Sequence, residues 1–299
     1  MLATRLLTAA VLGPVVLVAA VLGEPWLSVL LGLVIFLAMV ELIALLDAAA
    51  IEPPQVLTLL AGFAVGTTGL VAANAASVGG ALSDLLRATA TPGLALLVLA
   101  GSIVVLGIAS FARADPRTGF LSWSASTFGV AYIGLLVPSI ALVGHLGPPG
   151  GSPSTAVGGL SLGAGAAWTL TLIVVVWGYD TGAYLTGRWL GRHRLIDHIS
   201  PSKTVEGLGG GLVLATLAAG LGTWLTGLEP WHALVLGPVV GIAAQAGDLA
   251  ESLVKRAAGR KESGFLIPGH GGILDRIDSF LFAAPVLVGY ALLLGGVST

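Results

Sequence analysis

The sequence predicts an all-α, polytopic membrane protein with about nine transmembrane helices and a cytoplasmic amino terminus. Three observations lead to this prediction. Of the 299 residues, 56% are hydrophobic and only 9% are charged, whereas ordinary soluble proteins have about 25% charged residues. The apolar residues form long runs rather than alternating patterns, which favours helices over a β-barrel. The Lys and Arg residues gather on one side of the predicted helices, which orients them in the membrane.

Nine apolar runs are long enough to cross a bilayer, whose hydrocarbon core of about 30 Å requires roughly 20 helical residues. We expect the spans at approximately Leu6–Leu22, Trp26–Leu46, Val56–Ala73, Leu94–Phe111, Leu121–Val143, Gly163–Tyr179, Leu208–Leu225, Trp231–Leu253 and Phe280–Leu294.

The basic residues support both the number of spans and their orientation. With the amino terminus in the cytoplasm, twelve of the thirteen Lys and Arg residues fall in cytoplasmic segments, and only Arg87 falls outside. Since the cytoplasmic loops of membrane proteins are enriched in Lys and Arg, one span missed or added in the middle would scramble this distribution.

The composition also excludes several classes of protein. With so few charged residues, the chain cannot cover the surface of a soluble enzyme of this length. It is also neither a disordered chain nor a nucleic-acid-binding protein. The sequence contains no Cys, so disulfides, thiolate nucleophiles and cysteine-ligated metal sites are impossible.

Polar motifs concentrate after residue 179, at the predicted cytoplasmic ends of the last four spans. The first motif, at residues 180–188, reads DTGAYLTGR, and its Asp180 directly follows an apolar run. This carboxylate either marks the end of a helix in water or belongs to a site at the inner interface. The Gly- and Arg-containing turn that follows it favours a site.

The second motif, at residues 199–207, reads ISPSKTVEG and precedes the seventh span. Either Ser202 or Thr204 is suited to cap that helix, with Glu206 in its first turn, where the helix dipole favours a carboxylate. The amino terminus of a helix beside Lys203 and several hydroxyl groups is also suited to bind a phosphate. Both interpretations can hold together.

The third motif, at residues 245–256, reads QAGDLAESLVKR. Helical spacing places Asp248, Glu251, Ser252 and Lys255 on one face. An ion pair between Glu251 and Lys255 explains these two residues but not Asp248, which lies inside an apolar run. A charge within a span costs a few kcal/mol at the bilayer centre and usually faces a cavity or a partner. We therefore expect Asp248 to belong to a site.

The fourth motif, at residues 268–279, reads PGHGGILDRIDS and leads into the last span. Asp275 and Asp278 lie one helical turn apart, and together with Asp248 they supply the oxygen ligands that Mg²⁺ prefers. The glycines before them let the backbone approach a ligand closely and turn amides toward an anion.

Together the four motifs predict a membrane-embedded site that is open to the cytoplasm, with carboxylates for a divalent cation and basic residues for phosphates. This combination suits phosphoryl or nucleotidyl transfer, and its place at the lipid face indicates a lipid acceptor. A basic loop that is merely attracted to anionic lipid would explain the basic residues alone. We treat residues 1–299 as one membrane domain, with a helical scaffold at 1–160 and a catalytic portion at 161–299.

The segment 252–278 resembles the signature motif of the phosphatidate cytidylyltransferase (CDP-diacylglycerol synthase) family, with the spacing intact over about 27 residues. Residues 180–184 and 199–207 also resemble the upstream motifs of this family. Residues 1–160 resemble it only in hydropathy and in the number of spans. The chain departs from the family pattern at Glu262, where relatives usually have Asp, and we assign no metal role to this residue.

The resemblance implies that the chain transfers CMP from CTP to phosphatidate, giving CDP-diacylglycerol and pyrophosphate for phospholipid biosynthesis. It implies that the protein depends on Mg²⁺, with room for a second cation, and forms a homodimer. From the compact nine-span chain we expect a multi-pass protein of the cell inner (plasma) membrane. The lipid phosphate attacks the α-phosphorus in line. No enzyme nucleophile is needed, because a phosphate monoester is already largely ionised at neutral pH.

We distribute the site residues over three roles. The expected metal ligands are Asp248, Asp275, Asp278 and Ser252. The expected catalytic residues are Lys203, Lys255, Arg256, His270 and Asp275. The expected substrate-binding residues are Ser200, Ser202, Lys203, Thr204, Lys255, Arg256, Lys261, Gly271, Gly272, Arg276 and Asp180, the last at the rim.

Two further residues keep open roles in this interpretation. His270 either positions a phosphate, transfers a proton or has a structural role in the glycine-rich loop. Glu41, near the inner end of the second span, either faces the site or lies at the inner interface, and we expect the interface.

Two rival functions remain. A CTP-dependent kinase of dolichol or a related polyprenol would share a cytoplasmic nucleotide site but would transfer the γ-phosphoryl group to a lipid alcohol. The intact signature motif argues against it. A secondary transporter would use the buried charges as an ion path, but transporters tend to show repeats and sites near the midplane. Here the charges lie on one face.

Overall fold

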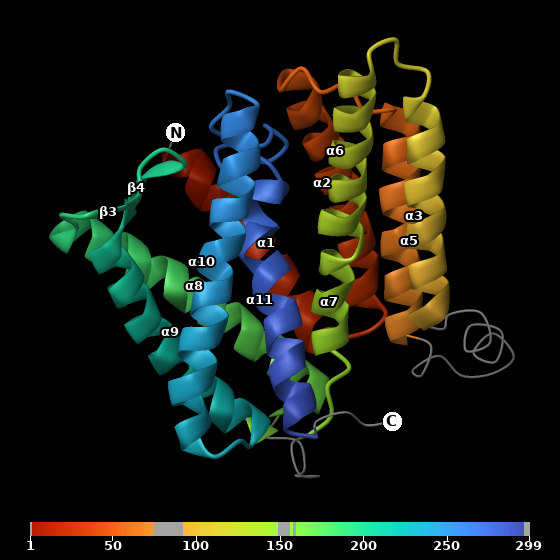
Figure 1. The fold of residues 1–299 in the computed structure, drawn as a ribbon. Helices are drawn as coiled ribbons and strands as arrows, with labels where there is room; N and C mark the ends of the chain where they lie inside the picture. Colours follow the sequence, from red (N-terminus) through yellow and green to blue (C-terminus); the bar gives the residue numbers. More distant parts are fainter. Residues whose placement is uncertain (1, 75–91, 149–155, 158–159, 296–299) are drawn as a thin grey trace, which may run out of the picture. The chain divides into compact units, whose positions relative to one another are not determined.

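The computed structural model describes residues 2–74, 92–148, 156–157 and 160–295, and within them helices dominate, as the sequence predicted (Figure 1). The helices are α1 (Leu2–Leu22), α2 (Trp26–Ala48), α3 (Gln55–Asn74), α5 (Pro92–Ser110), α6 (Pro116–Gly134), α7 (Leu136–Val143), α8 (Ala164–Leu190), α9 (Val205–Thr226), α10 (Ala233–Ala257) and α11 (Leu274–Leu293), with a 3₁₀ turn, η2, at Pro230–His232.

Among the described residues, seven helices are long and apolar enough to cross a membrane. They correspond to the second to fifth and the seventh to ninth predicted spans, so the protein is a multi-pass membrane protein. The other two predicted spans fall in helices outside this set. Leu6–Leu22 lies in α1, whose apolar part is the shorter segment Ala10–Leu22. Gly163–Tyr179 lies in α8, a helix of 27 residues whose last part is polar.

One prediction about the polar residues is wrong, and another concerns a residue outside the described part of the chain. Asp180 does not end a helix, because α8 continues through the polar segment to Leu190. Arg87, the one basic residue predicted outside, lies outside the described residues.

The chain divides into two compact units. Unit 1 comprises Met1–Leu12, Glu24–Ala141 and Val254–Arg276, and unit 2 comprises Gly13–Gly23, Leu142–Leu253 and Ile277–Thr299.

In unit 1, α3 packs against α2, α5 and α6. Glycines allow the helices to approach closely. A Cβ at Gly66 would lie 2.7 Å from the Ile35 side chain of α2, and one at Gly134 would lie 3.0 Å from the Gly62 carbonyl oxygen of α3. Small residues of this kind permit tight helix packing in membranes, where apolar burial alone does not drive association.

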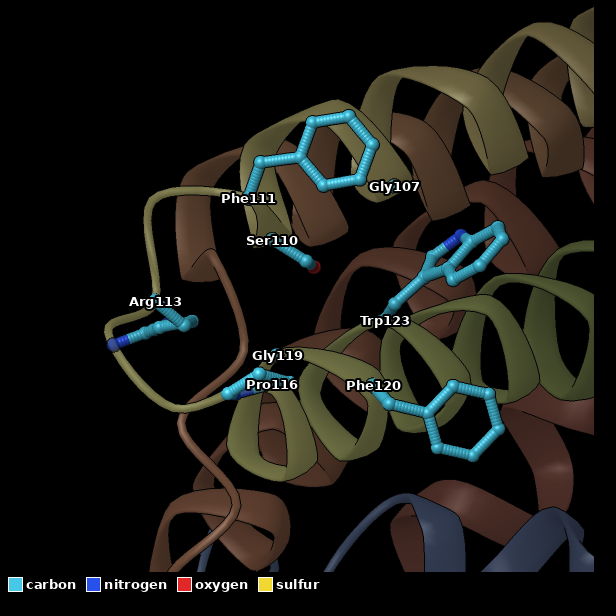
Figure 2. Close-up of a pocket in the computed structure, with 8 residues that line it drawn as sticks. All are labelled: Gly107, Ser110, Phe111, Arg113, Pro116, Gly119, Phe120 and Trp123. Carbon is cyan, nitrogen blue, oxygen red and sulfur yellow. The ribbon is translucent and has the colours of Figure 1, made fainter.

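A mostly apolar cavity of about 370 Å³ lies where α5 is connected to α6 in unit 1 (Figure 2). Its wall includes Phe111, Phe120 and Trp123, together with Arg113. The Arg113 guanidinium is engaged with Glu52, donating from Nη1 to the carboxylate at 2.7 Å and from Nη2 to the backbone carbonyl at 2.6 Å. The cavity wall includes no carboxylate.

In unit 2, α8 and α9 form the most extensive helix pair, and Figure 1 shows them side by side. Between them the chain forms a short antiparallel hairpin that the sequence analysis missed, made of β3 (Arg194–Ile196) and β4 (Ser200–Thr204). A second two-stranded pair consists of β1 (Ala156–Val157) and β2 (Leu160–Ser161). The α9 cap is as predicted for Thr204, whose hydroxyl accepts from the Gly207 amide at 3.0 Å.

The α8–α9 packing leads to a matched pair of substitutions. Gly182→Ala would place a Cβ 2.5 Å from the Gly210 carbonyl oxygen, a backbone atom that cannot move away cheaply. We expect a loss of about 1–3 kcal/mol, typical of overpacking, measured as a lower unfolding temperature in detergent. Gly209→Ala on α9 meets nothing within 4 Å. This substitution should leave the stability unchanged or raise it by up to about 1 kcal/mol. Equal unfolding temperatures of the two variants would contradict this packing.

Candidate functional site

Helices α10 and α11 carry seven of the predicted site residues, including all four expected metal ligands, and both motifs have the expected local structure. In α10, the Ser252 hydroxyl lies 3.4 Å from Asp248 Oδ1, one turn before it, and Lys255 follows in the next turn. The last helix, α11, begins at Leu274, so Asp275 and Asp278 lie in its first two turns. The amino-terminal end of a helix favours such carboxylates through its dipole.

In unit 2, Lys203 forms an ion pair with Asp248, and both side chains are about three-quarters buried or more. Lys203 lies in β4, just before the capping Thr204. Its ammonium group also lies 3.5 Å from Gln245 Oε1, which accepts a hydrogen bond of 2.7 Å from the Tyr179 hydroxyl. Tyr179 and Gln245 are buried. This network holds the Lys203 ammonium beside the Asp248 carboxylate.

The helices α10 and α11 approach each other closely beside this network. A Cβ at Gly247 would collide with the backbone of Asp278, so only a glycine fits this position. The Asp278 carboxylate folds back on its own helix, where Oδ1 accepts from the Ser279 amide at 2.6 Å. The glycine before Asp248 therefore allows the backbones that carry Asp248 and Asp278 to lie in contact.

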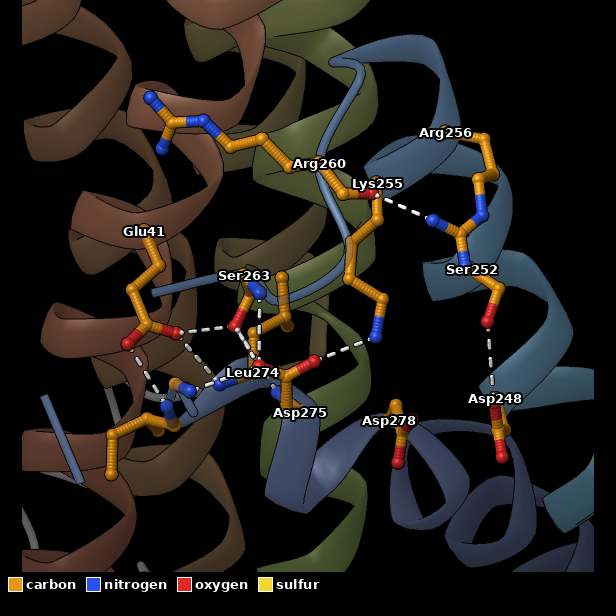
Figure 3. A network of polar contacts seen from close by, with 12 residues as sticks. Glu41, Asp248, Ser252, Lys255, Arg256, Arg260, Ser263, Leu274, Asp275 and Asp278 are labelled. Carbon is orange, nitrogen blue, oxygen red and sulfur yellow. Dashed lines mark hydrogen bonds and ion pairs between the residues drawn. The ribbon is translucent and has the colours of Figure 1, made fainter. Parts of the chain in front are cut away.

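In unit 1, the Lys255 ammonium donates to Asp275 Oδ1 at 2.6 Å (Figure 3). The two side chains are only 10% and 8% exposed. The other carboxylate oxygen, Oδ2, lies 2.9 Å from each of three donors, the Ser263 amide, the Ser263 hydroxyl and the Gly272 amide. Charge-assisted hydrogen bonds of this kind fix both the charge and the orientation of a carboxylate.

A polar cavity of about 260 Å³ lies next to this ion pair in unit 1, lined by Glu262, Gly269, His270, Asp275 and Arg276. The loop that forms it turns tightly, with a hydrogen bond of 2.9 Å from the Ile267 amide to the Gly271 carbonyl.

Glycine is required at two positions of this loop. Gly269 and Gly271 both have a φ of +78°, in the left-handed region that other residues rarely adopt. The His270 ring between them is held from outside the loop, since its Nδ1 lies 2.5 Å from the Thr8 hydroxyl of α1. The loop therefore places a held imidazole and Gly269 in the wall of a polar cavity.

A carboxylate that sequence analysis did not assign to the site lies behind this loop. Glu41 of α2 is only 4% exposed, whereas we expected it at the inner interface. Its two oxygens accept from the Ile273 and Leu274 amides, each at 2.9 Å, and Oε2 lies 3.0 Å from the Ser263 hydroxyl (Figure 3). The sequence contained a signal, because a carboxylate within an apolar run usually has a buried partner.

The remaining predicted residues lie in varied surroundings. Asp180, Ser202, Arg256, Lys261 and Arg276 are exposed, and Ser200 is buried. The Arg256 guanidinium donates to the Arg260 carbonyl at 3.1 Å, as Figure 3 shows. Gly272 is packed tightly, because a Cβ there would collide with the Ser263 hydroxyl and the Glu41 carboxylate. The exposed residues are thus accessible, whereas Gly272 has a packing role that the motif alone did not reveal.

The predicted metal ligands do not form a closed cluster in the described residues. Within the part of the chain that the structure describes, no three His, Cys, Asp or Glu side chains are grouped closely enough to hold a metal ion. Asp248 and Asp275 are instead each paired with a Lys ammonium. Their oxygen atoms, with those of Asp278 and Ser252, are of the chemical type that Mg²⁺ prefers.

Comparison with known proteins indicates the same family as the motif at residues 252–278. Residues 3–294 match the Cytidylyltransferase family. The chain is 35% identical over 295 residues to a protein of Synechocystis sp. named Phosphatidate cytidylyltransferase, covering 92% of this chain and 91% of the relative. A Bacillus subtilis protein of the same name is 44% identical over 125 residues, which are 41% of this chain and 46% of the relative. The chain is also 44% identical over 123 residues to the Uncharacterized protein YnbB of Escherichia coli, 41% of each chain. A match to the family model along nearly the whole chain shows that this protein belongs to the cytidylyltransferase family.

Proposed function

We propose that this protein is a phosphatidate cytidylyltransferase, which transfers CMP from CTP to phosphatidate and forms CDP-diacylglycerol and pyrophosphate. The observation that carries the proposal is the site in unit 1. There the signature segment supplies a buried Lys255–Asp275 ion pair beside a polar cavity that is also lined by His270 and Arg276. The similarity along nearly the full length of a relative named for this activity supports it.

The reaction needs positioning and charge stabilisation rather than an enzyme nucleophile. An oxygen of the lipid phosphate attacks the α-phosphorus of CTP, and the bond from that phosphorus to the oxygen bridging to the β-phosphate breaks. The negative charge that develops on the departing pyrophosphate is stabilised by cationic side chains. We assign this role to Lys203, Lys255 and Arg256, with Lys261 and Arg276 as further phosphate contacts.

The loop that lines the polar cavity binds phosphate oxygens in this proposal. The backbone at Gly271 and Gly272 approaches the nucleotide, and the His270 ring positions a phosphate. On the hairpin side, the hydroxyls of Ser200, Ser202 and Thr204 accompany Lys203, with Asp180 at the rim.

We also propose that Mg²⁺ is bound by Asp248, Asp275, Asp278 and Ser252, with one or two cations in total. The residues fit this group chemically, because carboxylate and hydroxyl oxygens are the ligands of a hard divalent cation. When bound, Mg²⁺ neutralises phosphate oxygens and withdraws electron density from the reacting phosphorus.

The orientation and assembly belong to the same proposal. The distribution of Lys and Arg supports a cytoplasmic amino terminus, an active site that faces the cytoplasm, and an inner (plasma) membrane location. CTP and phosphatidate are then reached from the cytoplasm and from the bilayer, respectively. We propose a homodimer as in the family.

The first prediction concerns the reaction itself. Purified protein in detergent, given phosphatidate and each nucleoside triphosphate in turn, should form CDP-diacylglycerol from CTP when Mg²⁺ is present and not when it is removed with a chelator. Mass spectrometry of the lipid product distinguishes this outcome from a kinase, which would produce a lipid phosphate from a lipid alcohol. If the purified protein did not turn over CTP in detergent, this result would contradict a transferase function of either kind and would favour a transporter.

The second prediction concerns Asp275. Asp275→Asn should lower kcat by more than about 100-fold, because the variant loses charge at the reacting phosphates. Since it also leaves the Lys255 ammonium without its carboxylate partner, Asp278→Asn serves as a second variant with the same expected loss. Size-exclusion chromatography and thermal unfolding would verify that both fold. As a control, Asp47→Asn changes an exposed carboxylate that accepts from Gln55 on the surface and should leave kcat unchanged. Full activity in both Asp275→Asn and Asp278→Asn would refute the metal assignment.

A further inference from the structure

Glu41 is the buried carboxylate of unit 1 that the proposed mechanism does not use. It belongs to α2, a helix that could cross the membrane, and it lies far from the signature segment in the sequence. Nevertheless all the hydrogen bonds described for it reach that segment, at Ser263, Ile273 and Leu274. A side chain of the predicted scaffold therefore contacts the segment that carries the proposed chemistry.

The contacts of Glu41 secure the start of α11. Oε1 accepts from the Ile273 amide and Oε2 from the Leu274 amide, both at 2.9 Å. These amides belong to the group at a helix amino terminus that has no acceptor within the helix. The carboxylate therefore caps α11 from another helix, and the dipole of α11 stabilises its charge. The next residue in α11 is Asp275.

A second route leads from Glu41 to Asp275 through one hydroxyl group. Ser263 Oγ lies 3.0 Å from Glu41 Oε2 and 2.9 Å from Asp275 Oδ2. The hydroxyl has one proton, which it donates to one carboxylate at a time, and it lies in contact with both. Figure 3 shows this line of contacts from Glu41 through Ser263 to Asp275 and on to Lys255. The position of the Asp275 carboxylate is consequently tied to that of Glu41 both through the backbone and through Ser263.

The loop is shaped to admit the Glu41 carboxylate. A Cβ at Gly264 would lie 2.7 Å from Glu41 Oε1, and one at Gly272 would collide with Oε2. Glycine at these positions is required by close approach rather than by a special backbone angle. Because a buried carboxylate is costly unless its oxygens are hydrogen-bonded, Glu41 strongly favours the one loop conformation that supplies its donors.

We infer that Glu41 is a positioning residue for cytidylyl transfer, which holds the loop 263–274 so that Asp275 and Lys255 are fixed beside the polar cavity. The inference rests on the proposed function. Glu41 does not line the cavity, so it acts through Asp275 and not on the substrates. A purely structural cap would stabilise the fold without a specific effect on turnover.

The test compares Glu41→Gln with the wild-type protein. The amide of Gln keeps the size of the side chain but replaces one acceptor oxygen by a donor, which cannot accept from the loop. We expect kcat to fall about 10–100-fold, the usual effect of removing a residue that orients a reacting group. The KM for CTP should change by less than about threefold, because no substrate contact is lost. Asp47→Asn on the same helix is the matched control and should have wild-type kcat.

Hydrogen exchange gives a readout that does not depend on activity. Amides of peptides covering residues 262–275 should exchange at least about tenfold faster in Glu41→Gln, because the loop opens more often. Peptides from the α5–α6 region should exchange as in the wild-type protein. An unchanged exchange rate at 262–275 would overturn the inference.

The variant Ser263→Ala separates positioning from stability. It should also lower kcat, and combining it with Glu41→Gln should lower kcat less than the product of the two single effects, because both act on Asp275. The inference would be overturned if the two substitutions lowered kcat independently, so that their effects multiply. It would also be overturned if kcat in these variants followed only the fraction of folded protein. If the wild-type protein forms CDP-diacylglycerol and Glu41→Gln is equally active, the positioning role is overturned but the proposed function is not. No CDP-diacylglycerol from the wild-type protein overturns the proposed function, and with it this inference.

Discussion

The buried ion pair between Lys255 and Asp275 is the interaction on which the candidate site in unit 1 depends. Removing two charges from water costs several kcal/mol each, and their attraction offsets this only when the remaining lone pairs are satisfied. Three donors around Asp275 Oδ2 meet this requirement. The loop around Asp275 is therefore not free to vary, since any conformation that withdraws those donors leaves a buried carboxylate incompletely solvated.

The same principle operates in unit 2, where Lys203 pairs with Asp248. There the supporting groups are Gln245 and Tyr179, which are buried and hydrogen-bonded to each other. In both places a lysine of the proposed phosphate-binding set is held by an aspartate of the proposed metal-binding set. Lysines held in this way are preorganised near the carboxylates, so little conformational entropy is lost when phosphates are bound.

Hydropathy predicted the parts of this fold that depend on long apolar runs, and it was less informative where polar residues continue a helix. A helix does begin where the span at 163–179 was predicted, but α8 is not among the seven helices apolar enough to cross a membrane. It runs on to Leu190, because helical hydrogen bonding does not require apolar side chains. The hairpin of β3 and β4 has no alternating apolar pattern, so periodicity could not reveal it. Asp248, Asp275 and Lys255 could be selected as candidates from the sequence because the spacing of each motif is local to a single helix.

Glu41 shows why the rest of the site could not be predicted from spacing. Its partners are more than 220 residues away in the chain, and one sequence carries no signal that links such positions. The rule applied to Asp248, that a carboxylate inside an apolar run has a partner, applies equally to Glu41. It indicates that a partner exists but not where it lies, because that depends on tertiary packing.

The contact between Thr8 and His270 extends this reasoning to the chemistry of the loop. The Thr8 hydroxyl has one proton, and its neighbours include His270 Nδ1 at 2.5 Å and the Pro268 carbonyl at 3.4 Å. If it donates to Nδ1, the proton of a neutral His270 is on Nε2, which then is a donor suited to a phosphate oxygen. If it donates to Pro268, it accepts from Nδ1, and Nε2 is a base. Both arrangements keep the hydroxyl in contact with Nδ1. The direction of this one hydrogen bond, from a residue of the first helix that no motif includes, therefore decides whether the loop presents a donor or an acceptor.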